Sequence, residues 1–197
     1  MVTQIEENDL IKRCQQGEIN CFNRLVENYQ VPVFNLALRM MGDVHSAEDA
    51  AQETFISAWK GIESFQLVNF KSWLMRICAN TCRDYLRSSK RSPKVSLEDN
   101  FAALSEAVTP SHDNPEVLAE RKMVEEEIQK GLNTLHPDQK LAVVLCDLQE
   151  MNYDEIAGIM GTSIGTVRSR ISRGRQHLRD YLLKQGELFG NQIRLIE

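Results

Sequence analysis

The sequence predicts an all-helical protein built from two small domains and a linker. Apolar residues recur at three- and four-residue spacing along most of the chain, and no segment shows sustained two-residue alternation. The prolines at 93, 110 and 115 fall in a stretch rich in serine and asparagine, which is typical of a linker. We therefore expect a first domain over residues 1–91, a linker over 92–115, a second domain over 116–185 and a tail over 186–197.

The first domain is expected to consist of helices that share one apolar core. Helical spacing starts at residues 9–14 and continues over 21–41, on both sides of Pro32. The sequence Ser46-Ala47-Glu48-Asp49 has the form of a capping box, so the next helix is expected to begin there. Its apolar face would contain Ala51, Phe55, Ala58, Trp59 and Ile62. A further helix is expected after a loop over residues 64–69. Its inward-facing residues would be Phe70, Trp73, Leu74, Ile77, Thr81 and Tyr85.

The second domain is expected to contain four helices, over residues 115–135, 137–148, 152–160 and 163–183. Pro137 suits the first turn of a helix because its missing N–H would have no helical partner there. Asn152 and Ser163 are both of the types that cap helix N-termini, and Gly161 between them supplies a tight turn.

The last two of these helices carry the most informative pattern in the chain. Two helices joined by a glycine turn are the helix-turn-helix arrangement. The second helix has an apolar stripe that is expected to be buried, formed by Ile164, Val167, Ile171 and Leu178. Its other side carries arginine, hydroxyl and amide groups, which contact base edges and phosphates in a major groove. These candidate duplex contacts are Ser163, Thr166, Arg168, Ser169, Arg170, Ser172, Arg173 and Gln176. A solvated basic helix packed on a core is the alternative interpretation.

Basic residues are concentrated in two segments, although the formal net charge is −5. Residues 71–94 hold seven basic residues against one acid, and residues 164–180 hold five against one. The connecting segment, residues 95–127, holds nine acids and two bases. The distribution of charge matters more than its sum, so this pattern favours contact with nucleic acid at two places.

Part of the first basic segment forms a stripe along one face of its helix. Spacing of i, i+4, i+7 and i+11 places together Arg76, Asn80, Arg83 and Arg87. Such a stripe can follow the backbone of a displaced DNA strand while a neighbouring loop encloses an unstacked base. A solvated helix face explains the same residues when they are taken alone.

Three segments together resemble a known family. GTVRSRISRGRQHL, residues 165–178, looks like the −35-reading segment of extracytoplasmic-function (ECF) sigma factors, the compact branch of the sigma-70 family. AEDAAQETFISAWKGIESF, residues 47–65, resembles the core-binding region of that family. FKSWLMRICANTCRDYLRS, residues 70–88, resembles its −10-reading region. The resemblance covers roughly residues 10–185, in the order that the family has.

The resemblance also implies roles for individual residues. It places −10 contacts at Ser64, Phe65, Gln66, Asn69, Arg76, Asn80, Arg83 and Arg87. The loop among them lacks a glycine that many relatives carry, so its base preference is open. Contacts with the β′ clamp helices of RNA polymerase are implied for Asp49, Gln52 and Glu53, which are otherwise read as a solvated acidic face.

By the same resemblance, the protein directs core RNA polymerase to promoters and assists −10 melting, for a stress or envelope regulon. The expected partners are promoter DNA (duplex at −35, single-stranded at −10), the polymerase core through its β′ clamp helices and β flap, and an anti-sigma factor. The first ten residues show no secretory signal and no apolar stretch is long enough to span a membrane. We therefore expect a cytoplasmic protein without membrane insertion.

Enzyme, metal and cofactor chemistry have no support in the sequence. It shows no glycine-rich phosphate loop, nucleophile elbow or paired-carboxylate arrangement, so we expect no catalysis, cofactor or metal. The five cysteines are an odd number without disulfide spacing, and reduced, packed thiols are expected. Two alternatives stay open. A dimeric DNA-binding regulator explains only the second domain, and a structural helical protein leaves the arginine face unused.

Overall fold

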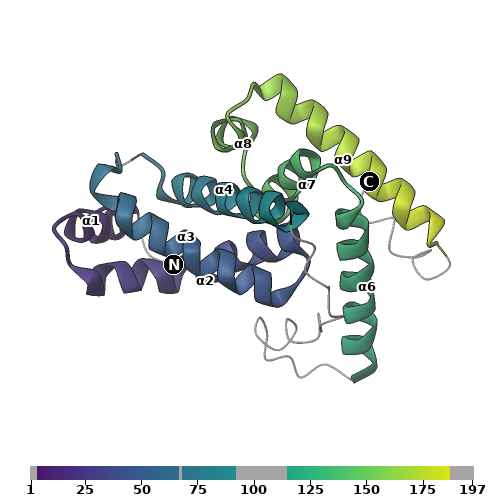
Figure 1. Cartoon of the computed structure of the whole chain (residues 1–197), viewed down its shortest axis with the longest axis horizontal. Coiled ribbons are helices and arrows are strands. Elements are labelled where there is room, and N and C mark those ends of the chain that lie inside the picture. Colours follow the sequence, from purple (N-terminus) through teal and green to yellow (C-terminus); the bar gives the residue numbers. More distant parts are fainter. Residues whose placement is uncertain (1–3, 67, 92–114, 187–197) are drawn as a thin grey trace. The chain divides into compact units, whose positions relative to one another are not determined.

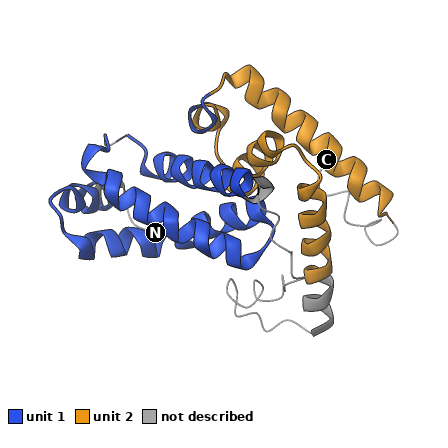
Figure 2. Cartoon of the chain, in the orientation of Figure 1, with its two compact units in different colours: residues 1–96, 158–161 blue, residues 97–157, 162–197 orange. Residues whose placement is uncertain are grey.

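The computed structural model describes residues 4–66, 68–91 and 115–186. All regular structure in this part of the chain is helical, as the sequence predicts. The chain forms two compact units, residues 1–96 with 158–161 and residues 97–157 with 162–197 (Figure 2). The predicted linker, apart from Pro115, and the predicted tail, apart from Gly186, lie outside the described residues.

Unit 1 is a small bundle built on three helices that pack against one another (Figure 1). Its elements are α1 (Gln4–Gln15), α2 (Ile19–Met41), α3 (Val44–Gly61), the 3-10 turn η1 (Ile62–Ser64) and α4 (Phe70–Arg91). Helices α2, α3 and α4 form the bundle, and α1 packs on α2. The helix α2 continues through Pro32 and ends at Met41; its C-cap is Gly42, whose φ of 88° suits glycine.

The start of α3 differs from the predicted capping box. Asp43 is the N-cap, and its carboxylate accepts a hydrogen bond of 2.8 Å from the backbone N–H of Ser46. Ser46 is therefore the third helical residue rather than the cap, and α3 begins at Val44. An aspartate carboxylate satisfies an early helical N–H and also interacts favourably with the helix dipole, so it serves well at this position.

The buried face of α4 also differs from the predicted one. The buried positions centre on Leu74, Met75, Cys78, Ala79 and Cys82, together with Phe70. Four residues that were expected to point inward are only half-buried: Trp73, Ile77, Thr81 and Tyr85. Because α4 packs against both α2 and α3, its most buried stripe lies between these two contacts, rotated from the stripe that the apolar spacing indicates.

The cysteines are packed thiols, as expected. Cys14, Cys21, Cys78 and Cys82 are buried, Cys146 is half-buried, and all five are free. Within the described residues, no group of three or more His, Cys, Asp or Glu side chains could hold a metal ion.

The thiols of unit 1 make its stability depend on alkaline pH. Burial raises the pKa of Cys14 from its ordinary 9.0 to about 11, and burial also raises the pKa of Cys21. The unfolded thiols ionise first as pH rises, so this contribution to stability is complete below pH 9 and is lost on the way to pH 11. We expect urea unfolding, followed by fluorescence of Trp59 and Trp73, to show falling stability over this range. A Cys14→Ala variant should show a shallower fall, and equal slopes would contradict the assignment.

Unit 2 consists of helices that pack around α9. Its elements are α6 (Pro115–Asn133), α7 (Pro137–Val143), a π-helical turn η3 (Val144–Leu148), the first part of α8 (Tyr153–Met160), whose residues 158–160 are grouped with unit 1, and α9 (Ile164–Lys184). Both α6 and α7 pack against α9 (Figure 1). The helix expected over residues 137–148 thus changes to π-helical geometry after Val143. In the described part of the chain, no helix is long and apolar enough to cross a membrane.

A buried lysine joins the end of α6 to α7. Lys140 is 5% exposed, and its Nζ donates a 2.8 Å hydrogen bond to Oδ1 of Asn133. The same oxygen accepts a hydrogen bond of 3.0 Å from Gln129, another buried polar residue. A buried charge is costly unless it is well paired, so these bonds stabilise the position of α7 beside α6.

Candidate nucleic-acid and polymerase interfaces

The turn between α8 and α9 has the local chemistry that the sequence predicts. Asn152 Oδ1 accepts from Glu155 N and Glu155 Oε2 accepts from Asn152 N, both at 3.0 Å, so α8 starts with a complete capping box. Gly161 has a φ of 61°, which favours glycine. Ser163 caps α9 by accepting the N–H of Thr166 at 3.2 Å. These contacts fix the angle at which the chain enters α9.

One side of α9 packs very closely on α7. Val167, Ile171, Gly174 and Leu182 are buried along this side. A Cβ atom at Gly174 would lie 2.7 Å from Cγ2 of Val143 and 3.3 Å from the backbone oxygen of Gln139. Glycine is therefore required here for the approach of the two helices. Ile164, which the sequence assigned to this buried stripe, is 40% exposed at the edge of the packed side, and Leu178 is half-buried.

Two ion pairs hold α9 from the packed side. Nη2 of Arg170 lies 2.7 Å from Oδ2 of Asp138 in α7. Nε of Arg175 donates a 3.2 Å hydrogen bond to Oδ2 of Asp147 in the π-helical turn, and hydrogen bonding to this carboxylate raises the pKa of Arg175. Arg170 is also a predicted DNA contact, and that role stays a prediction; in the structure one of its Nη atoms bonds to Asp138.

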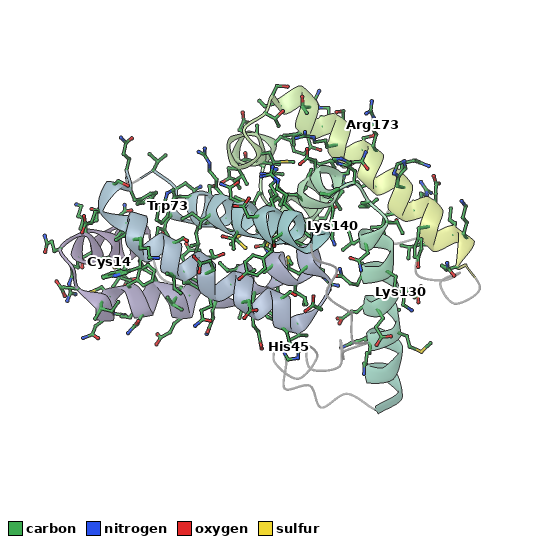
Figure 3. All side chains as sticks on the ribbon, in the orientation of Figure 1. Cys14, His45, Trp73, Lys130, Lys140 and Arg173 are labelled. Atoms are coloured by element: carbon green, nitrogen blue, oxygen red, sulfur yellow. The ribbon has the colours of Figure 1, made fainter. Side chains whose placement is uncertain are left out.

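The opposite side of α9 is open to solvent. The exposed candidates are Ser163, Arg168, Ser172, Arg173 and Gln176. Figure 3 shows Arg173 projecting away from the α9 ribbon. Two further candidates are half-buried and bonded within the helix: Ser169 Oγ donates to Thr166 O at 2.9 Å, and Thr166 Oγ1 lies 2.9 Å from Ser163 Oγ. The surface available for base edges is thus centred on Arg168, Ser172 and Arg173.

Gly165 is a feature of this surface that the sequence analysis missed. It is exposed in the first turn of α9, and it has no positive φ that would require glycine. A Cβ at this position would meet only Oγ of Ser163, at 3.9 Å. Glycine in a helix is less stable than alanine by about 0.5–1 kcal/mol, and no contact among the described residues explains that cost. Packing explains the glycine at position 174 but not the one at position 165, and this difference marks Gly165 as a candidate functional residue.

In unit 1 the predicted basic stripe lies along the surface of α4. Arg76, Asn80 and Arg87 are exposed, and Arg83 is half-buried. Nη1 of Arg83 donates a hydrogen bond of 3.5 Å to Oδ1 of Asn80, and Nη1 of Arg87 lies 3.4 Å from the carboxylate of Asp84. The Arg87 contact is long and exposed, so it leaves that guanidinium available for a phosphate backbone.

The loop before α4 is fixed at both ends. Phe65 is buried at 9% exposure, with its ring centroid 4.8 Å from that of Trp73 and 5.7 Å from that of Phe70. Phe65 is among the predicted −10 contacts; its ring packs in an aromatic cluster, and the contact with DNA stays a prediction. The exposed candidates of the loop are Ser64, Gln66 and Asn69. Val68, which the sequence analysis missed, is 83% exposed, and only its exposure distinguishes it.

The candidate polymerase-binding residues share one exposed face of α3. Asp49, Gln52 and Glu53 are all exposed. Ile56, at the next position of this face, is 40% exposed and gives it an apolar centre that the sequence analysis missed. Burial raises the pKa of Tyr85 in α4, and the charges of Asp49 and Glu53 raise it further.

Comparisons with known proteins match both units to one family. Residues 25–92 match sigma-70 region 2, and residues 125–178 match sigma-70 region 4. The ECF RNA polymerase sigma-E factor of Escherichia coli is 36% identical over 182 residues, which cover 89% of this chain and 94% of the relative. The chain belongs to the sigma-70 family as an ECF sigma factor. The RNA polymerase sigma-H factor of Pseudomonas aeruginosa is 32% identical, with 89% of this chain and 93% of the relative covered.

Further relatives and solved structures agree with this ECF assignment. ECF sigma factor SigE of Mycolicibacterium smegmatis is 37% identical over 86% of this chain, and the match spans 64% of that longer relative. CnrH, solved with the cytosolic domain of CnrY, is 26% identical with a TM-score of 0.66, and 92% of this chain and 99% of that one are covered. RpoE of Bartonella quintana, solved with the anti-sigma factor NepR, is 28% identical with a TM-score of 0.62. The match covers 82% of this chain and 96% of that one. The protein is thus a transcription initiation factor rather than an enzyme.

Proposed function

We propose that this ECF sigma factor reads a bipartite promoter through two of its own surfaces. The region 4 domain, over residues 116–185, would read the −35 duplex, and the region 2 domain, over residues 1–91, would hold the melted −10 strand. The observation that carries the proposal is the presence of two separate basic surfaces, on α9 and on α4, each beside a rigidly anchored turn or loop. The regulon is proposed to respond to stress or to the state of the envelope.

At −35, α9 would lie in the major groove with its packed side turned to α7. Arginine contacts guanine O6 and N7 in a bidentate manner, and Arg168 and Arg173 have exposed side chains suited to this. Hydroxyl groups of Ser163 and Ser172 would contact phosphates. The open position at Gly165 would allow the DNA backbone to approach the first turn of α9, where backbone N–H groups favour an anion.

Replacing Arg173 with alanine is expected to weaken −35 binding by about 1–3 kcal/mol, because a base-edge contact is lost. The measurement is the affinity of reconstituted holoenzyme for promoters that differ only at −35. An Arg179→Ala variant removes another exposed arginine of α9 and serves as the control. Undiminished −35-dependent binding by the Arg173 variant would contradict the assignment.

At −10, the stripe of α4 would follow the backbone of the non-template strand, and the loop over residues 64–69 would receive an unstacked base. Melting would require no hydrolysis by the factor, because capture of unstacked bases and polymerase contacts offset the cost of opening. The contacts proposed here are Ser64, Gln66, Asn69, Arg76, Asn80, Arg83 and Arg87. Phe65 would support them from the aromatic cluster.

The remaining partners are proposed from the family and from the charge of the surfaces. The α3 face around Asp49, Gln52 and Glu53 would contact the β′ clamp helices, and the region 4 domain would contact the β flap. An anti-sigma factor is proposed as a further partner, supported by the NepR complex of the Bartonella relative. With these partners, we propose that the protein acts in the cytoplasm.

One experiment separates this function from its rivals. A sigma factor should co-purify with core RNA polymerase and then support run-off transcription from a promoter that core alone does not use. A dimeric regulator would bind duplex DNA as a dimer without entering holoenzyme, and a structural helical protein would do neither. Failure to bind core polymerase would overturn the proposal.

A further inference from the structure

A glutamine at the end of α1 is bonded to the beginning of the 64–69 loop. Nε2 of Gln15 donates hydrogen bonds to two backbone carbonyl oxygens, that of Ile62 at 3.1 Å and that of Phe65 at 2.8 Å. Because both acceptors are carbonyls, only the NH₂ end of the side chain can satisfy them. The partners lie 47 and 50 residues away in sequence, so these bonds form a tertiary tether rather than a local turn contact.

The tether acts where the loop leaves the helical core. The oxygen of Ile62 also accepts the N–H of Phe65 at 3.1 Å, which closes the 3-10 turn. The ring of Phe65 is fixed by the aromatic cluster, so backbone and side chain are both held at this residue. At the other end of the loop, Oδ1 of Asn69 accepts the N–H of Ser72 at 2.9 Å.

We propose that Gln15 is a positioning residue that sets the direction in which the loop presents Gln66 and Val68 to an unstacked −10 base. The proposal rests on the −10 function proposed above for this loop. Both side chains are exposed between the anchored ends, so the anchors decide where they project. A site that selects among bases must be held in place before the base arrives, because each loose degree of freedom weakens discrimination.

Three substitutions of Gln15 separate hydrogen bonding from shape. Gln15→Met keeps a similar length but has no donor, and Gln15→Glu places a carboxylate against the two carbonyl oxygens. Gln15→Lys retains donors for both oxygens and tests rescue. Gln16→Met is the matched control, because Gln16 is the exposed neighbouring glutamine just beyond α1.

The assay is transcription by holoenzyme reconstituted from core polymerase and the full-length chain. The probe is a promoter library randomised over the −35 and −10 segments, and the transcripts are sequenced. We expect Gln15→Met and Gln15→Glu to reduce base discrimination in the −10 segment by about fivefold to tenfold, since two hydrogen bonds are lost. Discrimination at −35 and affinity for core should be unchanged, and Gln15→Lys and Gln16→Met should behave like the unmodified protein.

Two results would overturn the positioning role. One is full −10 discrimination by the Gln15→Met holoenzyme. The other is an equal loss at −35 and −10 together with a lower melting temperature, which would show that Gln15 serves only the stability of the fold. A holoenzyme of the unmodified chain without any −10 preference would instead overturn the proposed function of the loop, and the role of Gln15 with it.

Discussion

Replacing Gly174 with valine is expected to destabilise unit 2 by about 1–3 kcal/mol, the usual cost of overpacking a core. The first added carbon would lie 2.7 Å from Cγ2 of Val143 and 3.3 Å from the backbone oxygen of Gln139, and the backbone atom cannot rotate away. The helix α9 must therefore move away from α7 and strain the Arg170–Asp138 ion pair. Because the exposed arginines of α9 move with it, −35 binding by the holoenzyme should fall more than for Arg173→Ala.

The positions of the two tryptophans make this prediction easy to test. Trp59 and Trp73 both belong to unit 1, so their fluorescence follows the unfolding of that unit alone. Circular dichroism follows the helices of both units. The Gly174 variant should shift the circular dichroism transition and leave the fluorescence transition unchanged. Gly158→Val, at a helical glycine of α8 that is grouped with unit 1, is the control for packing: a Cβ there meets no atom within 4 Å, so both transitions should stay close to those of the unmodified chain. Equal stability of the two variants would contradict the packing argument.

The parts of the fold that the sequence predicted correctly depend on contacts within a few residues. The capping bonds of Asn152 and Ser163 each join residues three apart, so residue type and spacing suffice to predict them. The buried face of α4 was predicted in the wrong rotation, because it depends on two helices that cover it from different sides. At α3, the cap was predicted at Ser46, and the structure places it three residues earlier at Asp43, another residue type that caps helices.

The same difference between local and tertiary contacts applies to the candidate sites. Exposure of Arg168 and Arg173 could be predicted, because they lie opposite an apolar stripe. The ion pair between Arg170 and Asp138 could not be predicted, because the two residues are 32 positions apart in sequence. Val68 and Ile56 were missed for a related reason: an apolar residue gives no sign in the sequence that the fold leaves it exposed. Each of these three residues needed tertiary contacts for its assignment.

Reversing one charge on the α3 face is expected to weaken core polymerase binding strongly. Glu53→Lys places a positive charge in the middle of the proposed contact with the basic β′ clamp helices. A like-charge contact across an interface costs several kcal/mol, so we expect a loss of roughly a hundredfold or more in affinity. The fold should be unaffected, because Glu53 is exposed and its hydrogen bond with Ser57, at 3.4 Å, is long. Competition with the unmodified chain for core polymerase provides the measurement.

Two further variants distinguish a specific face from a general effect of charge. Glu27→Lys makes the same change of charge at an exposed position of α2 in the same unit. It should leave core affinity within about twofold of the unmodified chain, because charge outside the α3 face is screened.

Ile56→Ser removes the exposed apolar centre without changing any charge. It should also weaken binding, because a packed apolar centre excludes water around the charged contacts. If Glu53→Lys and Glu27→Lys weakened binding equally, net charge rather than this face would determine the affinity for core. If Ile56→Ser had no effect, the contact would depend on the acidic residues alone.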